Sequence, residues 1–120
     1  MLSMIIPTFA RRRILGYVWV VASLVAIGFI SFGVWVHHMF AVGAPDLTNS
    51  FFSVAGLIIT FPSAVQIFAW TGTLWTGRPV WRTPLLFAIG SVVIFVLGGI
   101  TGVMVSTVPF DWQATDSYFV

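Results

Sequence analysis

The chain has 120 residues, of which 59% are hydrophobic and only 7% are charged, and its mean hydropathy is +1.07. A soluble domain carries about 25% charged residues, so this composition excludes a water-soluble globular domain. The 120 residues contain no cysteine, which excludes disulfides and thiol-ligated clusters within them.

Three apolar stretches are each long enough to cross a bilayer, which takes roughly 20 residues. They run from about 15 to 36, from 51 to 71 and from 85 to 105. Lipid offers no partner to unpaired backbone groups, and the stretches do not alternate as barrel strands do, so helices are expected. The sequence therefore predicts an all-α integral membrane protein with three transmembrane helices.

Arginines flank the apolar stretches on one side only. Arg11 to Arg13 precede the first stretch, and Arg78 and Arg82 lie between the second and the third. All three aspartates lie in the other connections. Because arginine-rich loops stay in the cytoplasm, this pattern predicts a cytoplasmic N-terminus. A topology signal explains the five arginines better than a nucleic-acid-binding surface would. The N-terminal sequence does not indicate a cleavable signal peptide.

Two adjacent histidines, His37 and His38, close the first stretch and are the only ones in the chain. Beside Trp35 they could be polar anchors at the membrane boundary. Imidazole is also the usual ligand of copper, zinc and iron. Neighbours on a regular helix diverge by about 100°, so both can bind one metal only where the helix ends or unwinds. Gly43 and Pro45 follow the pair, which suits that condition.

The second stretch follows a polar connection in which Thr48, Asn49 and Ser50 are candidate helix N-caps. Its interior contains Pro62, which cannot donate a hydrogen bond to the carbonyl of Ile58. The sequence therefore predicts a kink in this helix.

A small and polar face runs along the same helix, within an arc of roughly 140° at 100° per residue. Such a face should point at protein or water, and helix–helix contact is its commonest cause. Gln66 is its costliest member to bury and needs a partner. The face consists of Ser53, Gly56, Thr60, Ser63 and Gln66.

Glycine and proline mark the bounds of the third helix. Gly77-Arg78-Pro79 should end the second helix, Thr83-Pro84 should begin the third, and Pro109 should end it. Inside it, Gly98 and Gly102 form a G-x-x-x-G pair. Packing against a helix or against a flat cofactor would explain this pair, and the motif alone is more typical of helix packing.

Five segments together resemble subunit I of the haem–copper oxidases, with the closest likeness to cytochrome c oxidase. They are "GVWVHHMFAVG" (33–43), "FPSAVQIFAW" (61–70), "TPLLFAIG" (83–90), "GGITGVM" (98–104) and "DWQATDSYFV" (111–120). The motifs follow the order and spacing of that family, from about Pro7 onward. The resemblance implies that residues 1–120 are a fragment covering the seventh to ninth of twelve core helices.

The resemblance also implies roles for single residues. His37 and His38 match the pair that ligates the copper facing the high-spin haem, where dioxygen is reduced to water. The third copper histidine and the haem ligands of the family lie outside the 120 residues. The other matches are Gly99 and Gly102 near that haem, Asp111 near a haem propionate, Asp116 at a magnesium site, and Ser63 and Gln66 in a proton path.

Two positions depart from the family pattern. Many members have lysine at the position of Gln66, and a glutamine can hold water but cannot titrate. Many have histidine at the position of Thr115, so the magnesium site is in question. Asp116 and waters could still supply the oxygen ligands that Mg²⁺ accepts.

The chain is expected to be part of the catalytic subunit of a proton-translocating terminal oxidase. The expected location is a cell membrane rather than the mitochondrial inner membrane. The resemblance implies the remaining subunit I segments, other oxidase subunits, cytochrome c and the lipid bilayer as partners. The 120 residues alone should not reduce oxygen. Three alternatives stay open: a degenerate or structural oxidase fragment, a quinol-oxidising relative, and a small channel or transporter built on the polar face.

Overall fold

The computed structural model describes residues 1–119, without the side chains of Val36, His37 and Ala41. The fold is helical throughout this part of the chain, as predicted. Its helices are α1 (Leu2–Ala10), α2 (Tyr17–Val34), the 3₁₀ helix η1 (Trp35–Val42), α3 (Asp46–Ile58), α4 (Thr60–Thr76), α5 (Thr83–Val105) and α6 (Val108–Ala114).

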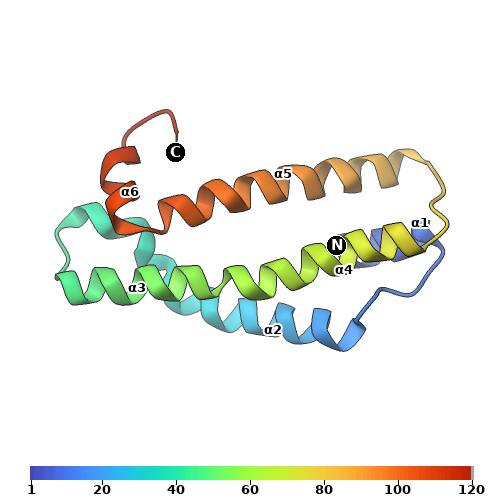
Figure 1. The fold of residues 1–120 in the computed structure, drawn as a ribbon, viewed down its shortest axis with the longest axis horizontal. Helices are drawn as coiled ribbons and strands as arrows, with labels where there is room; N and C mark the ends of the chain where they lie inside the picture. Colours follow the sequence, from blue (N-terminus) through green and yellow to red (C-terminus); the bar gives the residue numbers. More distant parts are fainter. Residues whose placement is uncertain (120) are drawn as a thin grey trace.

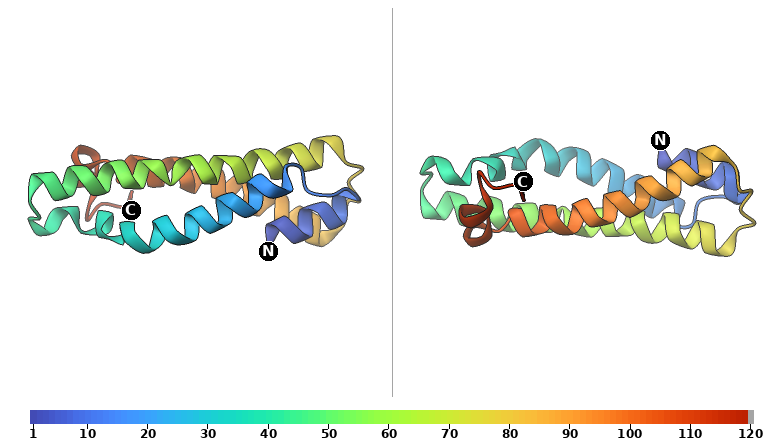
Figure 2. Two further views of the ribbon diagram at one scale, coloured as in Figure 1. Left: turned by 90° about the horizontal axis from the view of Figure 1, so that it is seen from below. Right: turned by 90° about the horizontal axis from the view of Figure 1, so that it is seen from above.

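Three long helical segments lie side by side and alternate in direction: α2, then α3 with α4, then α5 (Figures 1 and 2). The molecule is an elongated slab of 51 × 31 × 17 Å. We call one end, with η1, the start of α3 and α6, the histidine end. The opposite end holds the connections α1–α2 and α4–α5 and is called the arginine end.

Three helical spans are long and apolar enough to cross a membrane: Tyr17–Phe40, Asp46–Thr76 and Thr83–Val105. This finding confirms the three predicted spans. Only 17%, 11% and 6% of their most apolar windows are buried within the chain. Most of their apolar surface therefore has to be covered by lipid or by further protein.

The second span begins earlier than predicted, and none of Thr48, Asn49 and Ser50 is its N-cap. Pro45 occupies the N-cap position with φ −56° and ψ 145°, and the helix starts at Asp46. A carboxylate in the first turn faces the positive end of the helix dipole, which favours this start. The side chain of Asn49 instead donates to the carbonyl of Ala44 at 3.2 Å.

The helical ladder of the second span is interrupted near its proline. α3 ends at Ile58 and α4 begins at Thr60, so the interruption falls at Ile59, three residues before Pro62. The missing N–H of Pro62 leaves the Ile58 carbonyl without its regular donor. The disturbance predicted from Pro62 is thus present, one turn before the proline itself.

The third span begins at Thr83 with proline in its first turn, as predicted, but Pro109 does not end it. α5 stops at Val105, and the Ser106 N–H bonds to the carbonyl of Gly102 at 2.9 Å. Pro109 lies in the first turn of α6. A proline favours the start of a helix as much as it opposes continuation, and here it does the former.

A helix at residues 2–10 was not predicted. Leu2, Ile5 and Ile6 recur at helical spacing, and α1 packs this side against α4 and α5. The small core there contains Ile6, Trp70 and Ala88, and the Trp70 indole N–H donates to Ser3 Oγ at 2.9 Å. The periodicity was available in the sequence, but nine residues are too few to span a bilayer.

Candidate functional site

The two histidines lie in a segment that is not α-helical. α2 ends at Val34, and the chain continues as η1, within which Met39 departs from helical angles (φ −118°, ψ 25°). The pair thus lies where the chain leaves regular α-helix, which meets the condition set for two adjacent histidines that share a metal. The His38 side chain is exposed. The His37 side chain lies outside the described residues, so its contacts with a metal remain a prediction.

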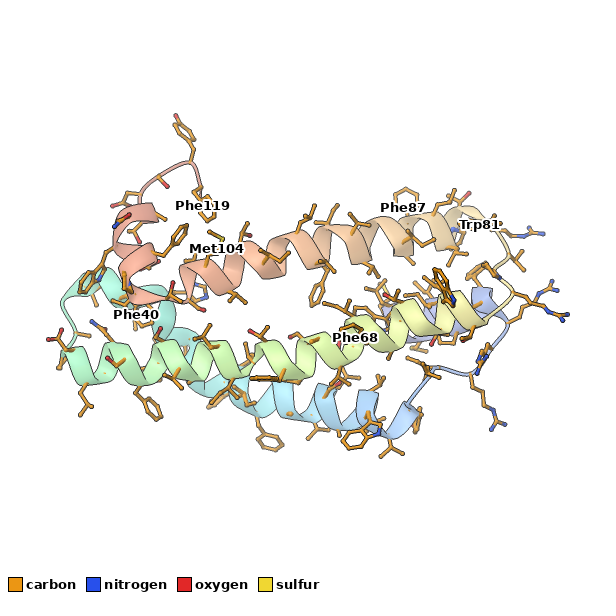
Figure 3. All side chains as sticks on the ribbon, in the orientation of Figure 1. Phe40, Phe68, Trp81, Phe87, Met104 and Phe119 are labelled. Atoms are coloured by element: carbon orange, nitrogen blue, oxygen red, sulfur yellow. The ribbon has the colours of Figure 1, made fainter. Side chains whose placement is uncertain are left out.

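The histidine-bearing turn is fixed by its neighbours at the histidine end. Phe40 is 1% exposed, and its backbone carbonyl accepts a hydrogen bond from the Trp112 indole at 3.2 Å. Figure 3 shows Phe40 at this end, close to α3 and α6. α6 is thereby tied to the turn, although 72 residues separate Phe40 from Trp112 in the sequence.

A polar hollow of 490 Å³ opens beside the turn. It brings Asp116 and Thr115 close to the end of η1, and Asp116 adopts the left-handed conformation (φ 64°). Asp111 does not line it, but is 5% exposed on α6. The lining consists of Phe40, Gly43, Ala44, Asp46, Asn49, Trp112, Thr115 and Asp116.

The described side chains do not complete a metal site. Asp46 and Asp116 are the only carboxylates at this hollow. No group of three His, Cys, Asp or Glu residues that could hold a metal ion is found within the described part of the chain. A metal at Asp116 would therefore need ligands other than these described side chains.

A second cavity, of 560 Å³, lies between the α3–α4 span and α5. We call it the interhelical cavity. It brings together Ser63, Gly99 and Gly102, three residues that the sequence assigned to a haem environment or a proton path. The lining is Gly56, Ile59, Thr60, Ser63, Ala64, Ile67, Phe95, Val96, Gly99, Ile100, Gly102, Val103, Met104 and Ser106.

One end of the interhelical cavity is closed by a contact between α3 and the end of α5. Ser53 Oγ donates to the Ser106 carbonyl at 2.9 Å. A Cβ on Gly56 would come within 3.2 Å of Ser106 Cβ, so only a glycine fits this approach without adjustment. The predicted polar face thus makes a helix contact at Ser53 and Gly56.

The glycines of α5 make no such contact within the chain. A Cβ added at Gly98, Gly99 or Gly102 would meet no atom within 4 Å. The helix-packing explanation of the G-x-x-x-G pair therefore does not hold inside the described chain. Gly99 and Gly102 instead keep the wall of the interhelical cavity flat and open.

The side chains of the remaining members of the polar face differ in whether they have a hydrogen-bond partner. The Ser63 hydroxyl donates back to the Ile59 carbonyl at 3.0 Å. Thr60 Oγ1 and Gln66 Nε2 are buried and have no hydrogen-bond partner among the described residues. Gln66 is 5% exposed and does not line the interhelical cavity. The partner predicted for its amide is therefore not found in the described structure.

The sequence did not predict a functional role for several residues that line the polar hollow and the interhelical cavity. Asn49 was considered only as a helix cap, and Trp112 had no distinguishing pattern before the hydrogen bond to Phe40 was seen. Ala64, Ile67 and Phe95 are apolar residues in apolar helices, so no sequence signal separates cavity-lining positions from lipid-facing ones. Asp46 could have been considered, because it is one of only three acids.

Comparison with known protein families identifies the family of this chain. All of residues 1–120 match the family model described as cytochrome c and quinol oxidase polypeptide I. The chain belongs to this family.

Individual members of the oxidase polypeptide I family are similar over nearly the whole chain. "Probable cytochrome c oxidase subunit 1-beta" of Nocardia farcinica is 47% identical over 119 residues, which are 99% of this chain and 20% of the relative. Cytochrome c oxidase subunit 1 of Bacillus subtilis is 45% identical over 98% of this chain and 19% of the relative. Cytochrome c oxidase polypeptide 1 of Halobacterium salinarum is 44% identical over 98% of this chain and 20% of the relative.

The chain thus spans about one fifth of the length of the curated relatives it matches. The family resemblance seen in the sequence is confirmed, and so is the prediction that the 120 residues correspond to a fragment of these longer proteins.

Proposed function

We propose that this chain is part of the catalytic subunit of a multi-subunit terminal oxidase in a cell membrane. In this proposal the complete enzyme reduces dioxygen to water with electrons from cytochrome c and translocates protons. The observation that carries the proposal is a cofactor-sized cavity and a histidine-bearing turn on one chain of the oxidase polypeptide I family. The relatives' names add cytochrome c as donor, and a quinol donor is the alternative.

The interhelical cavity suits a haem. Its 560 Å³ lies within the range of about 300–1,000 Å³ that small-molecule and cofactor sites occupy. Its lining is mostly apolar, and a flat ligand could approach the α5 backbone at Gly99 and Gly102. When bound, the haem would supply an iron that exchanges electrons and binds oxygen. Asp111 on α6 would then lie near a propionate of this haem.

His37 and His38 would hold copper in this proposal. Their place in η1 meets the condition that the helix must leave α geometry where neighbouring side chains share one metal. Neutral imidazoles bind copper without adding negative charge to an apolar site, and an apolar surround limits solvent access. A third ligand would come from outside the 120 residues.

Ser63 and Gln66 would serve the proton supply to this site. The Ser63 hydroxyl stands at the interhelical cavity, and the unpartnered Gln66 amide could be satisfied by ordered water. Glutamine does not titrate, so it would orient water rather than carry a proton itself. Magnesium is not part of the proposed function, because the described residues contain no group of three His, Cys, Asp or Glu side chains that could hold a metal ion.

The proposal is tested by the copper and haem content of the membrane complex purified with this chain. The wild type should contain both, and a His37→Ala/His38→Ala double variant should lose copper and keep haem. A Trp35→Phe variant, which leaves both imidazoles, is the control. If the wild-type complex holds no copper, the histidines are membrane anchors and the catalytic proposal fails.

The haem assignment has its own test on α5. Gly99→Leu should fill the interhelical cavity and lower the haem content of the purified complex at least severalfold. Gly90→Leu adds the same side chain to the same helix at a position that does not line the cavity, and should retain haem. Equal haem in both variants would show that haem binds elsewhere. Ion flux through the haem-free chain in liposomes would instead favour a channel.

A further inference from the structure

The backbone that carries the two histidines is not held by a regular α-helical ladder. η1 is a 3₁₀ helix of 8 residues, in which Met39 departs from helical angles and after which Gly43 adopts the left-handed conformation (φ 84°). Hydrogen bonds in 3₁₀ geometry are poorer than those in an α-helix, and runs longer than about three to four residues are uncommon. The conformation of this segment therefore depends on contacts from other elements.

Two side chains from other helices donate hydrogen bonds to the backbone around η1. The Trp112 indole on α6 donates to the Phe40 carbonyl at 3.2 Å. The Asn49 amide on α3 donates to the Ala44 carbonyl at 3.2 Å. We call these two hydrogen bonds the turn clamp. Phe40 is only two residues beyond His38, so one half of the turn clamp acts directly beside the histidines.

A third contact connects the two halves of the turn clamp. Ser53 Oγ on α3 donates to the Ser106 carbonyl at 2.9 Å, and Ser106 lies between α5 and α6. The connections thus run from α3 to the base of α6, along α6 to Trp112, across to η1 and back to α3 through Asn49. Supporting hydrogen bonds on rigid elements hold a binding site in its productive geometry.

Trp112 contributes more to the turn clamp than to packing. Its side chain is 57% exposed, and a tryptophan gains most from its ring when the ring is buried. Phe110 and Phe119 instead hold the end of the chain against α6, with their ring centroids 5.1 Å apart. The specific contribution of Trp112 is therefore the N–H that it donates to the Phe40 carbonyl.

We propose that Trp112 and Asn49 are positioning residues for the copper that His37 and His38 would hold. The turn clamp keeps this segment outside α geometry, which two adjacent imidazoles need in order to share one metal. The inference rests on the proposed function for the copper. The turn clamp itself can be measured without any metal.

The test uses the complete membrane complex that contains this chain and begins with amide hydrogen exchange. Trp112→Phe keeps an aromatic ring and removes the N–H. Peptides covering residues 35–44 should then exchange roughly fivefold faster, the factor by which one ordinary hydrogen bond shifts a local opening equilibrium. Asn49→Leu removes the other donor and should change the exchange in the same direction.

Copper retention is the second measurement. Each complex is incubated with a copper chelator, and only the copper that is absent from the His37→Ala/His38→Ala variant is counted. Trp112→Phe should lose this copper roughly fivefold faster than the wild type, because the same local opening releases it. The haem content of the variant should stay at the wild-type level.

Trp70→Phe is the matched control. It also removes an indole hydrogen bond, the one to Ser3 Oγ at 2.9 Å, but within the small core that α1 forms with α4 and α5. This variant should leave exchange of residues 35–44 and copper retention unchanged.

Three results would overturn the positioning role. They are unchanged exchange in Trp112→Phe, equal effects of Trp70→Phe, and faster exchange without faster copper loss. A wild-type complex without copper would overturn the proposed function and the copper role together. The exchange measurement would then still decide whether the turn clamp holds the segment.

Discussion

Single glycines have opposite roles at the two ends of this structure. At the arginine end, Gly77 is enclosed: a Cβ there would lie 2.7 Å from the Ala10 carbonyl and 2.8 Å from the Thr73 carbonyl. Both atoms belong to backbone that is already hydrogen bonded. In α5, by contrast, Gly99 and Gly102 face open space. Glycine is therefore required at Gly77 for a contact within the chain, whereas Gly99 and Gly102 leave the wall of the interhelical cavity open.

The residue-scale prediction concerns Gly77. Gly77→Ala should destabilise the chain by about 1–3 kcal/mol, the usual cost of forcing an extra methyl group into a packed site. Thermal unfolding of the purified protein in detergent measures this change. Gly90→Ala, where a Cβ meets nothing within 4 Å, is the matched control and should be neutral or slightly stabilising. Equal stability of the two variants would contradict the close approach of α4 to α1.

At the scale of the element, the second span combines a break with a cavity. The interruption at Ile59 separates α3, which contacts the end of α5 through Ser53, from α4, which packs on α1 and α2. The interhelical cavity opens beside this interruption, with Ile59 and Thr60 in its lining. The interruption that accompanies the proline thus lies in the wall of the interhelical cavity.

Replacement of Pro62 tests this role. Pro62→Ala restores an N–H for the Ile58 carbonyl, so α3 and α4 should join into one continuous helix. Spin labels at Leu47 and Trp75, both highly exposed, should then move farther apart in a pulsed electron resonance measurement. Phe61→Ala changes an exposed neighbour that already has its N–H, and should leave the distance unchanged. The same distance in both variants would contradict a role for the proline.

The sequence could predict the elements whose cause is local. Apolar length fixed the three spans, Thr83-Pro84 fixed the start of α5, and Pro62 indicated the break. The start at Asp46 was missed because a cap depends on which backbone geometry precedes the helix, and Pro45 supplies it. The site was only partly predictable: the α3 contact through Ser53 and Gly56 requires knowing that Ser106, 53 residues away from Ser53, lies opposite.

At the scale of the whole molecule, charge and shape are aligned. All arginines lie at one end of a slab 51 Å long, and all aspartates lie at the other. The length exceeds the hydrocarbon core of a bilayer, about 30 Å, so both ends can reach water or headgroups. Each arginine moved to the bilayer centre would cost about 2.5–3.5 kcal/mol, which opposes translocation of the arginine end.

This alignment predicts the topology, and the absence of cysteine from the chain makes it directly measurable. Thr83→Cys lies at the arginine end and Gln113→Cys at the histidine end, and both positions are exposed. In spheroplasts, a membrane-impermeant maleimide should label Gln113→Cys at once and Thr83→Cys only after permeabilisation. The reverse pattern would place the histidines on the cytoplasmic side. It would also contradict the cytoplasmic N-terminus that the arginines predict.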